Sequence, residues 1–187
     1  MGFRRGFKTE ANDIARDVRA ELRLRTTDPL NPWNLAECLD IPIIALSDFG
    51  TDAPTAVSHF SQTDTSAFSA VTVFRGTRRT VVHNDAHTIG RQANNVAHEI
   101  SHGLLQHPPT PALDDRGCRN WNKDVEDEAA WLGAALLVSE EAALAVVRQR
   151  LPIDEAADQY GVSPELMTMR INVTGARARV QRYKPRW

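Results

Sequence analysis

Apolar side chains recur at two different spacings along the chain, and these spacings separate helical from strand-like segments. Helical patterning, typical of helices with one buried face, runs through residues 8–25, 33–39, 91–106, 125–138, 140–151, 154–160 and 164–173. Short runs rich in apolar and β-branched residues predict strands at residues 41–46, 70–74 and 79–83. The last two runs flank Gly76, which favours a hairpin. Helices around one small sheet predict an α+β fold.

Three segments lack a clear period. Residues 47–70 are rich in Ser, Thr, Asp and Ala, which indicates a loop or sheet margin with a possible strand at residues 56–60. Residues 106–123 contain three prolines and join two of the predicted helices, so we expect a loop. The basic residues between 177 and 186 predict a disordered or partner-binding tail.

Residues 98–102 read His-Glu-Ile-Ser-His inside a predicted helix. At about 100° per residue, His98 and His102 lie about 40° apart on one helical face, so both rings can reach one tetrahedral ion. Glu99 lies on the flank of that face, where a carboxylate can hydrogen-bond a water at the metal and act as a general base. The alternative is a pair of hydrogen-bonded core histidines. Because an unpaired polar group in a buried helix costs about 1–3 kcal/mol, the motif favours a zinc site.

A catalytic zinc site usually has a third protein ligand, and two glutamates at the start of the helix at 125–138 compete for that role. Glu128 shares a helical face with the large apolar side chains that follow it, which favours Glu128 as the ligand. Glu126 projects about 200° away from Glu128 and remains the alternative. His107 lies about 140° round the helix from His102 and is excluded as a ligand.

Other polar residues near the motif suggest supporting roles. His83 ends the last predicted strand, where a solvent-exposed histidine is favoured over one that stabilises an oxyanion. Arg119 and Trp121 lie in the loop before the second helix and are candidates for substrate contacts. Cys38 and Cys118 lack CxxC spacing, so both are expected to be free thiols.

The order of these features resembles the ImmA/IrrE family of bacterial and phage zinc metallopeptidases. The resemblance spans residues 9–172 and rests on Asn-Pro-Trp-Asn-Leu-Ala at 31–36, His-Glu-Ile-Ser-His-Gly-Leu-Leu at 98–105, Glu-Asp-Glu-Ala at 126–129 and Val-Ser-Pro-Glu-Leu at 162–166. Ala130 departs from the pattern, because the family commonly has a polar residue there.

The resemblance implies a minimal zincin-like fold, in which a small β-sheet packs on the HExxH helix and on a second metal-ligand helix, with further C-terminal helices. It implies zinc held by His98, His102 and a glutamate that maps best to Glu128, with Glu99 as the base. It also implies an endopeptidase whose substrate is a regulatory protein, such as a helix-turn-helix repressor encoded nearby. The alternative is a non-catalytic zinc-containing regulatory protein that sequesters a repressor or contacts DNA.

Composition narrows the setting of this activity. A chain of 187 residues with 42% hydrophobic residues is expected to form one domain, with a metallopeptidase part at residues 1–150 and a helical extension and basic tail at 151–187. The net charge of −2 gives no general attraction for nucleic acid, and the helix at 164–173 carries a single base, Arg170. Without an apolar run of membrane-spanning length or a secretory signal, a cytoplasmic protein without membrane contact is expected.

Overall fold

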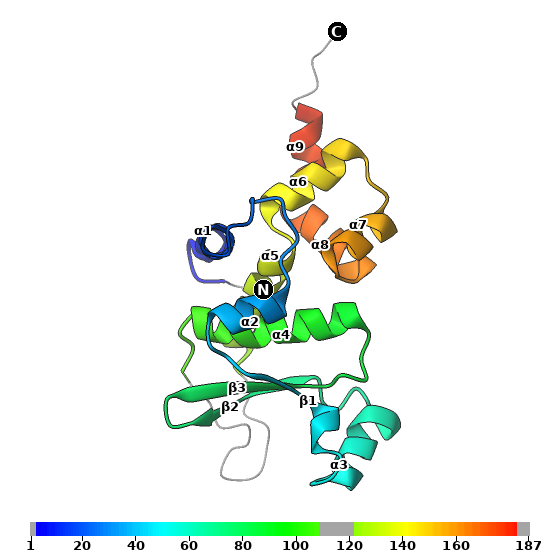
Figure 1. The fold of residues 1–187 in the computed structure, drawn as a ribbon. Helices are drawn as coiled ribbons and strands as arrows, with labels where there is room; N and C mark the ends of the chain where they lie inside the picture. The colour runs from blue at the N-terminus through cyan, green and yellow to red at the C-terminus, as the bar shows by residue number, and fades with distance from the viewer. Residues whose placement is uncertain (1–2, 109–121, 183–187) are drawn as a thin grey trace.

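A small sheet, a long helix lying across it and a layer of further helices make up the part of the chain that the structure describes (Figure 1). The computed structural model describes residues 3–108 and 122–182. Its helices are α1 (Phe7–Glu21), α2 (Pro32–Cys38), α3 (Pro54–Ser58), α4 (Ile89–Leu104), α5 (Lys123–Leu137), α6 (Glu140–Gln149), α7 (Ile153–Tyr160), α8 (Pro164–Val173) and α9 (Ala176–Arg182). The strands are β1 (Ile43–Ala45), β2 (Ala70–Arg75) and β3 (Arg78–His83).

The sheet has the order β1-β3-β2, so β2 forms one edge. Strand β1 is parallel to β3, and β2 is antiparallel to β3 in a register that pairs Thr72 with Val81. The hairpin predicted around Gly76 is confirmed, and Gly76 has a φ of 63°, a conformation that glycine adopts without a steric penalty. Side chains alternate between the two faces of a strand, so Thr72 and Phe74 share a face of β2.

Helix α4 lies between the sheet and the helical layer and contacts β2, β3, α2 and α5. Its buried apolar side chains divide between two clusters: Val96 and Ile100 pack with residues of α1, α5 and β3, whereas Ala93 and Ala97 pack with the C-terminal helices. The helix predicted at residues 91–106 is therefore confirmed. The spacing of its apolar residues reflects burial of the helix on two sides. The fold is α+β with the layout of a minimal zincin.

The position of α5 is fixed by two fully buried arginines at its C-terminal end. Arg19 of α1 donates to the carbonyl oxygen of Leu136 at 2.8 Å, and Arg170 of α8 donates to that of Val138 at 2.8 Å. Both guanidinium groups satisfy carbonyls that have no partner within the helix. Burial lowers the pKa of each arginine to about 10, which leaves both charged at neutral pH.

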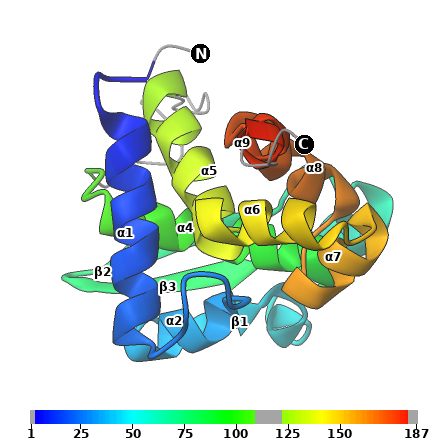
Figure 2. The same cartoon turned by 90° about the horizontal axis from the view of Figure 1, so that it is seen from above.

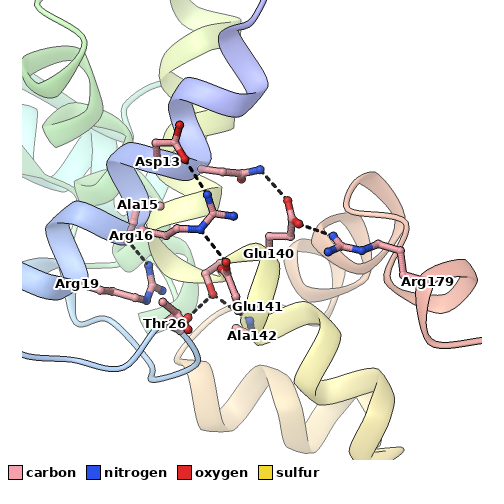
Figure 3. Close-up of polar contacts among 11 residues, drawn as sticks. Asp13, Ala15, Arg16, Arg19, Thr26, Glu140, Glu141, Ala142 and Arg179 are labelled. Carbon is pink, nitrogen blue, oxygen red and sulfur yellow. Dashed lines mark hydrogen bonds and ion pairs between the residues drawn. The ribbon is translucent and has the colours of Figure 1, made fainter. Parts of the chain in front are cut away.

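Ion pairs on the surface join α1 and α9 to the start of α6 (Figure 3). Arg16 of α1 donates to Glu141 at 2.7 Å, and Arg179 of α9 pairs with Glu140. The prediction of disorder is therefore wrong for residues 176–182, which form α9 with a buried Ala176, whereas partner binding by the basic residues stays a prediction. Figure 2 shows α6, α8 and α9 grouped beside the α1 and α5 pair. The remaining residues of that predicted tail lie outside the described part of the chain.

The possible strand at residues 56–60 is also wrong. Helix α3 begins at Pro54 and continues into a five-residue π-helical segment, His59–Thr63. Proline at the first helical position has the backbone φ that a helix requires, and its missing N–H needs no partner there. Among the described residues, no single helix has the length and apolar character to cross a membrane; α5 and α6 meet that test only together, with a bend of 49° between them.

Candidate metal centre

Side-chain nitrogen and oxygen atoms of three residues, two on α4 and one on α5, converge. The Nε2 atoms of His98 and His102 lie 3.1 Å apart. A carboxylate oxygen of Glu126 lies 3.2 Å from the His98 Nε2, and the other oxygen lies 3.7 Å from the His102 Nε2. His98, His102 and Glu126 form the one group with the geometry of a metal site within residues 3–108 and 122–182.

These separations suit zinc. With ligand bonds of about 2.0–2.1 Å, neighbouring ligand atoms of a tetrahedral zinc ion lie about 3.3 Å apart. The observed separations of 3.1, 3.2 and 3.7 Å bracket that value. Two imidazole nitrogens and a carboxylate also form a donor set that favours zinc over magnesium or calcium. The residues present therefore fit the metal.

The third member of the group is Glu126, whereas the sequence analysis favoured Glu128. Helix α5 approaches α4 most closely at Gly133, where a Cβ atom would lie 3.1 Å from the backbone nitrogen of His98. Glu126 precedes Gly133 by seven residues, two helical turns, and therefore lies on the same face of α5. The face with large side chains points elsewhere, because Trp131 packs on Phe3 with ring centroids 5.1 Å apart.

Glu128 lies in the second turn of α5 and projects from the other side of the helix. One of its carboxylate oxygens lies 3.2 Å from the Nε of Arg4, and the other lies 3.5 Å from the Nε2 of His107. The error in the sequence argument was to equate the most apolar face of α5 with the face toward the metal-bearing helix. Close helix contacts need small side chains, and glycine allows the closest approach.

Glu99 lies next to the three converging residues without belonging to their group. The hydroxyl of Thr72 on β2 donates to its Oε2 at 2.5 Å. Burial raises the pKa of the Glu99 carboxyl, whereas the hydrogen bond from Thr72 and the neighbouring His98 oppose that rise. A buried carboxylate with a raised pKa, held in place by a hydrogen bond from a hydroxyl, is suited to accept a proton from water.

Burial, together with the neighbouring His98, also lowers the pKa of His102 to about 4. The imidazole is therefore neutral at physiological pH, the form that binds metal. Thr72 is a site residue that the sequence analysis missed. Its only signal is a polar residue on a strand of the hairpin that leads into the helix with the motif.

The structure describes only one of the other polar residues that the sequence analysis singled out for supporting roles, His83. His83 is buried, with 6% of its surface exposed, and its ring meets that of Trp33 edge-on at 6.0 Å. The expectation of a solvent-exposed histidine is therefore wrong, and burial lowers the pKa of His83. Arg119, Trp121 and Cys118 lie outside the described residues, and no contact is assigned to them.

An α4 helix with the HExxH motif, laid across a small sheet and facing a glutamate on a second helix, defines a metallopeptidase of the zincin class. The family model described as Peptidase_M78, IrrE N-terminal-like domain, matches residues 36–172. The chain therefore belongs to this family. The matched range contains all three converging residues. No curated protein and no solved structure matches the chain.

Proposed function

We propose that this protein is a zinc-dependent endopeptidase in which His98, His102 and Glu126 bind the metal and Glu99 is the general base. The observation that carries the proposal is the convergence of two imidazole nitrogens, 3.1 Å apart, with a carboxylate whose oxygens lie 3.2 and 3.7 Å from them, beside the buried Glu99 carboxylate outside this group. Membership of a metallopeptidase family supports the same reading.

Zinc bound at this site supplies Lewis-acid polarisation of the scissile carbonyl and lowers the pKa of water to about 7. Glu99 accepts the proton of the attacking water and delivers it to the leaving amine, so that one carboxyl acts as base and then as acid. The hydroxyl of Thr72 donates to one oxygen of Glu99 and so holds the carboxylate in place.

The edge strand β2 provides a place for an extended substrate. Among the described strands, β2 pairs on one side only, with β3. Its other side therefore offers backbone donors and acceptors to a peptide that adds as a further strand. Thr72 joins this edge to Glu99, so a peptide aligned on β2 would run past the base.

We further propose that the substrate is a regulatory protein, for example a helix-turn-helix repressor encoded near this gene. This proposal comes from the resemblance to the ImmA/IrrE family. The competing function is sequestration, in which the zinc-containing protein removes a repressor from DNA without cutting it.

The test compares wild type with Glu99→Gln on a co-expressed candidate repressor. Glu99→Gln keeps the size of the side chain and removes the base, so zinc content should be unchanged while cleavage falls by at least about 100-fold. Glu37→Gln, an exposed carboxylate on α2, is the matched control and should cleave like wild type. Release of the repressor from DNA by both wild type and Glu99→Gln, without a cleaved fragment in the mass spectrum, would show sequestration instead.

A further inference from the structure

His107 contacts the candidate metal centre although it is not one of the three converging residues. Helix α4 ends at Leu104, and Gln106 follows with a left-handed φ of 54°. The backbone N–H of His107 then bonds the carbonyl of His102 at 2.9 Å, and that of Gln106 bonds the carbonyl of Gly103 at 3.1 Å. These are the two bonds of a Schellman motif. The turn brings the His107 ring back over the last turn of the helix.

The two imidazoles meet through their Nδ1 atoms, which lie 3.0 Å apart. The Nε2 of His102 faces the converging ligand atoms, so a metal would bind that nitrogen as a lone-pair donor. The proton of neutral His102 then resides on Nδ1, which donates to the Nδ1 of His107. His107 accepts there and carries its own proton on Nε2.

The Nε2 of His107 faces a carboxylate. The nearest oxygen of Glu128 lies 3.5 Å away, and an anion at that position favours the His107 tautomer with its proton on Nε2. The side chains of His107 and Glu128 are 10% and 14% exposed, so solvent screens this attraction little. Arg4 holds the other side of the Glu128 carboxylate at 3.2 Å.

We propose that His107 and Glu128 are positioning residues that fix the tautomer and ring orientation of His102 for the metal. This inference rests on the proposed function. Donors and acceptors agree along the whole chain of contacts, from His102 through His107 and Glu128 to Arg4. Glu128, which the sequence analysis assigned as a ligand, therefore acts on the metal ligand His102 through His107. Partners of this kind typically change metal affinity by about 10- to 100-fold.

Zinc affinity measured by competition with a chelator tests the role of His107. His107→Phe keeps an aromatic ring and removes both nitrogens, and should raise the Kd for zinc by about 10- to 100-fold with stoichiometry unchanged. His107→Asn places an amide oxygen near the lost Nδ1, and should restore part of that affinity. An affinity equal to wild type in His107→Phe would overturn the proposal.

A matched pair of glutamates tests the next contact. Arg4 pairs with Glu10 at 2.6 Å as well as with Glu128 at 3.2 Å, so Glu10→Ala and Glu128→Ala each remove one ion pair of the same arginine. Only Glu128→Ala removes the partner of His107. We expect weaker zinc binding, by about 10-fold or more, in Glu128→Ala alone. Equal zinc affinities in the two variants would contradict a role for Glu128 in positioning His107 and His102.

The tautomer itself is visible in long-range ¹H–¹⁵N spectra of the imidazole rings. The proposal expects His102 with its proton on Nδ1, in metal-free as well as zinc-loaded wild type, and loss of this preference in metal-free His107→Phe. A His102 with its proton on Nε2 in the metal-free protein would overturn it. Failure of the wild type to take up zinc would refute the proposed function. The spectrum of the metal-free protein would still show whether His107 fixes the tautomer of His102.

Discussion

The contact between α4 and α5 at Gly133 sets the distance between Glu126 and the two histidines, and Gly133→Ala tests this directly. The Cβ atom of alanine would lie 3.1 Å from the His98 nitrogen and 3.2 Å from the carbonyl carbon of Ala97. Ordinary contacts of a Cβ atom lie at 3.4–4 Å. Because the opposing atoms are helix backbone, the helices must separate by a few tenths of an ångström.

The expected cost combines two opposing effects. Overpacking of a close contact destabilises a protein by about 1–3 kcal/mol. Alanine in place of glycine within a helix stabilises it by about 0.8–1 kcal/mol. We therefore expect a net loss of about 1 kcal/mol in the free energy of unfolding. Displacement of His98 from Glu126 should weaken zinc binding in addition.

Urea unfolding of the metal-free protein and chelator competition measure these two effects. Gly103→Ala is the matched control on α4, because the atoms nearest its Cβ would all belong to the guanidinium group of Arg79, the end of a flexible side chain. The arginine can move aside, so stability should stay within about 0.5 kcal/mol of wild type or rise. If Gly133→Ala proves as stable as wild type and binds zinc equally well, the close approach at Gly133 does not set the geometry of the site.

Three further predictions concern the converging residues and the base. Glu126→Ala should be purified without zinc, whereas Glu128→Ala should keep about one zinc per chain when saturated, as elemental analysis will show. The pKa of His102 is lowered from 6.5 to about 4, so between these pH values the unfolded chain binds a proton that the folded chain lacks. As the pH falls from 6.5 to about 4, metal-free wild type should therefore lose stability relative to His102→Asn. Urea titrations at a series of pH values measure this loss. Thr72→Val removes the donor to Glu99 and should lower kcat/KM by about 10-fold with zinc content unchanged, and an unaltered rate would exclude a role for that hydrogen bond.

Much of the layout near the site was predictable from the sequence. The helix with the motif and the hairpin before it were predicted close to their observed bounds, because burial of α4 between the sheet and the helical layer imposes a strong apolar period. His98 and His102 were predictable as a pair because their spacing of four residues alone places both rings on one face.

The glutamate that converges with the two histidines was not predicted, because apolar character and small size are different signals. Glu126, Gly133 and Leu137 lie within about 40° of one another on α5, and the glycine marks the face toward α4. Glu128 lies on the face with Trp131 and Leu132, which packs against α1 and the residues before it. The position of the glycine could have identified the correct face.

The position of His107 and the burial of Arg19 could not be predicted from the spacing of apolar residues along a helix. His107 was excluded by continuing the helix past Leu104, whereas the chain turns back at Gln106, a residue type without the glycine signal for that turn. Arg19 reads as an exposed charge on an amphipathic helix. Only the packed structure shows that its guanidinium meets the last carbonyls of α5.

A zinc-edge anomalous difference map from crystals of the zinc-loaded protein tests the central claim most directly. The account predicts one strong peak about 2.0–2.2 Å from the Nε2 atoms of His98 and His102 and from a carboxylate oxygen of Glu126, with Glu99 outside bonding distance. A peak bonded to Glu128 or to Glu99 in place of Glu126, or no peak between the two histidines, would contradict it.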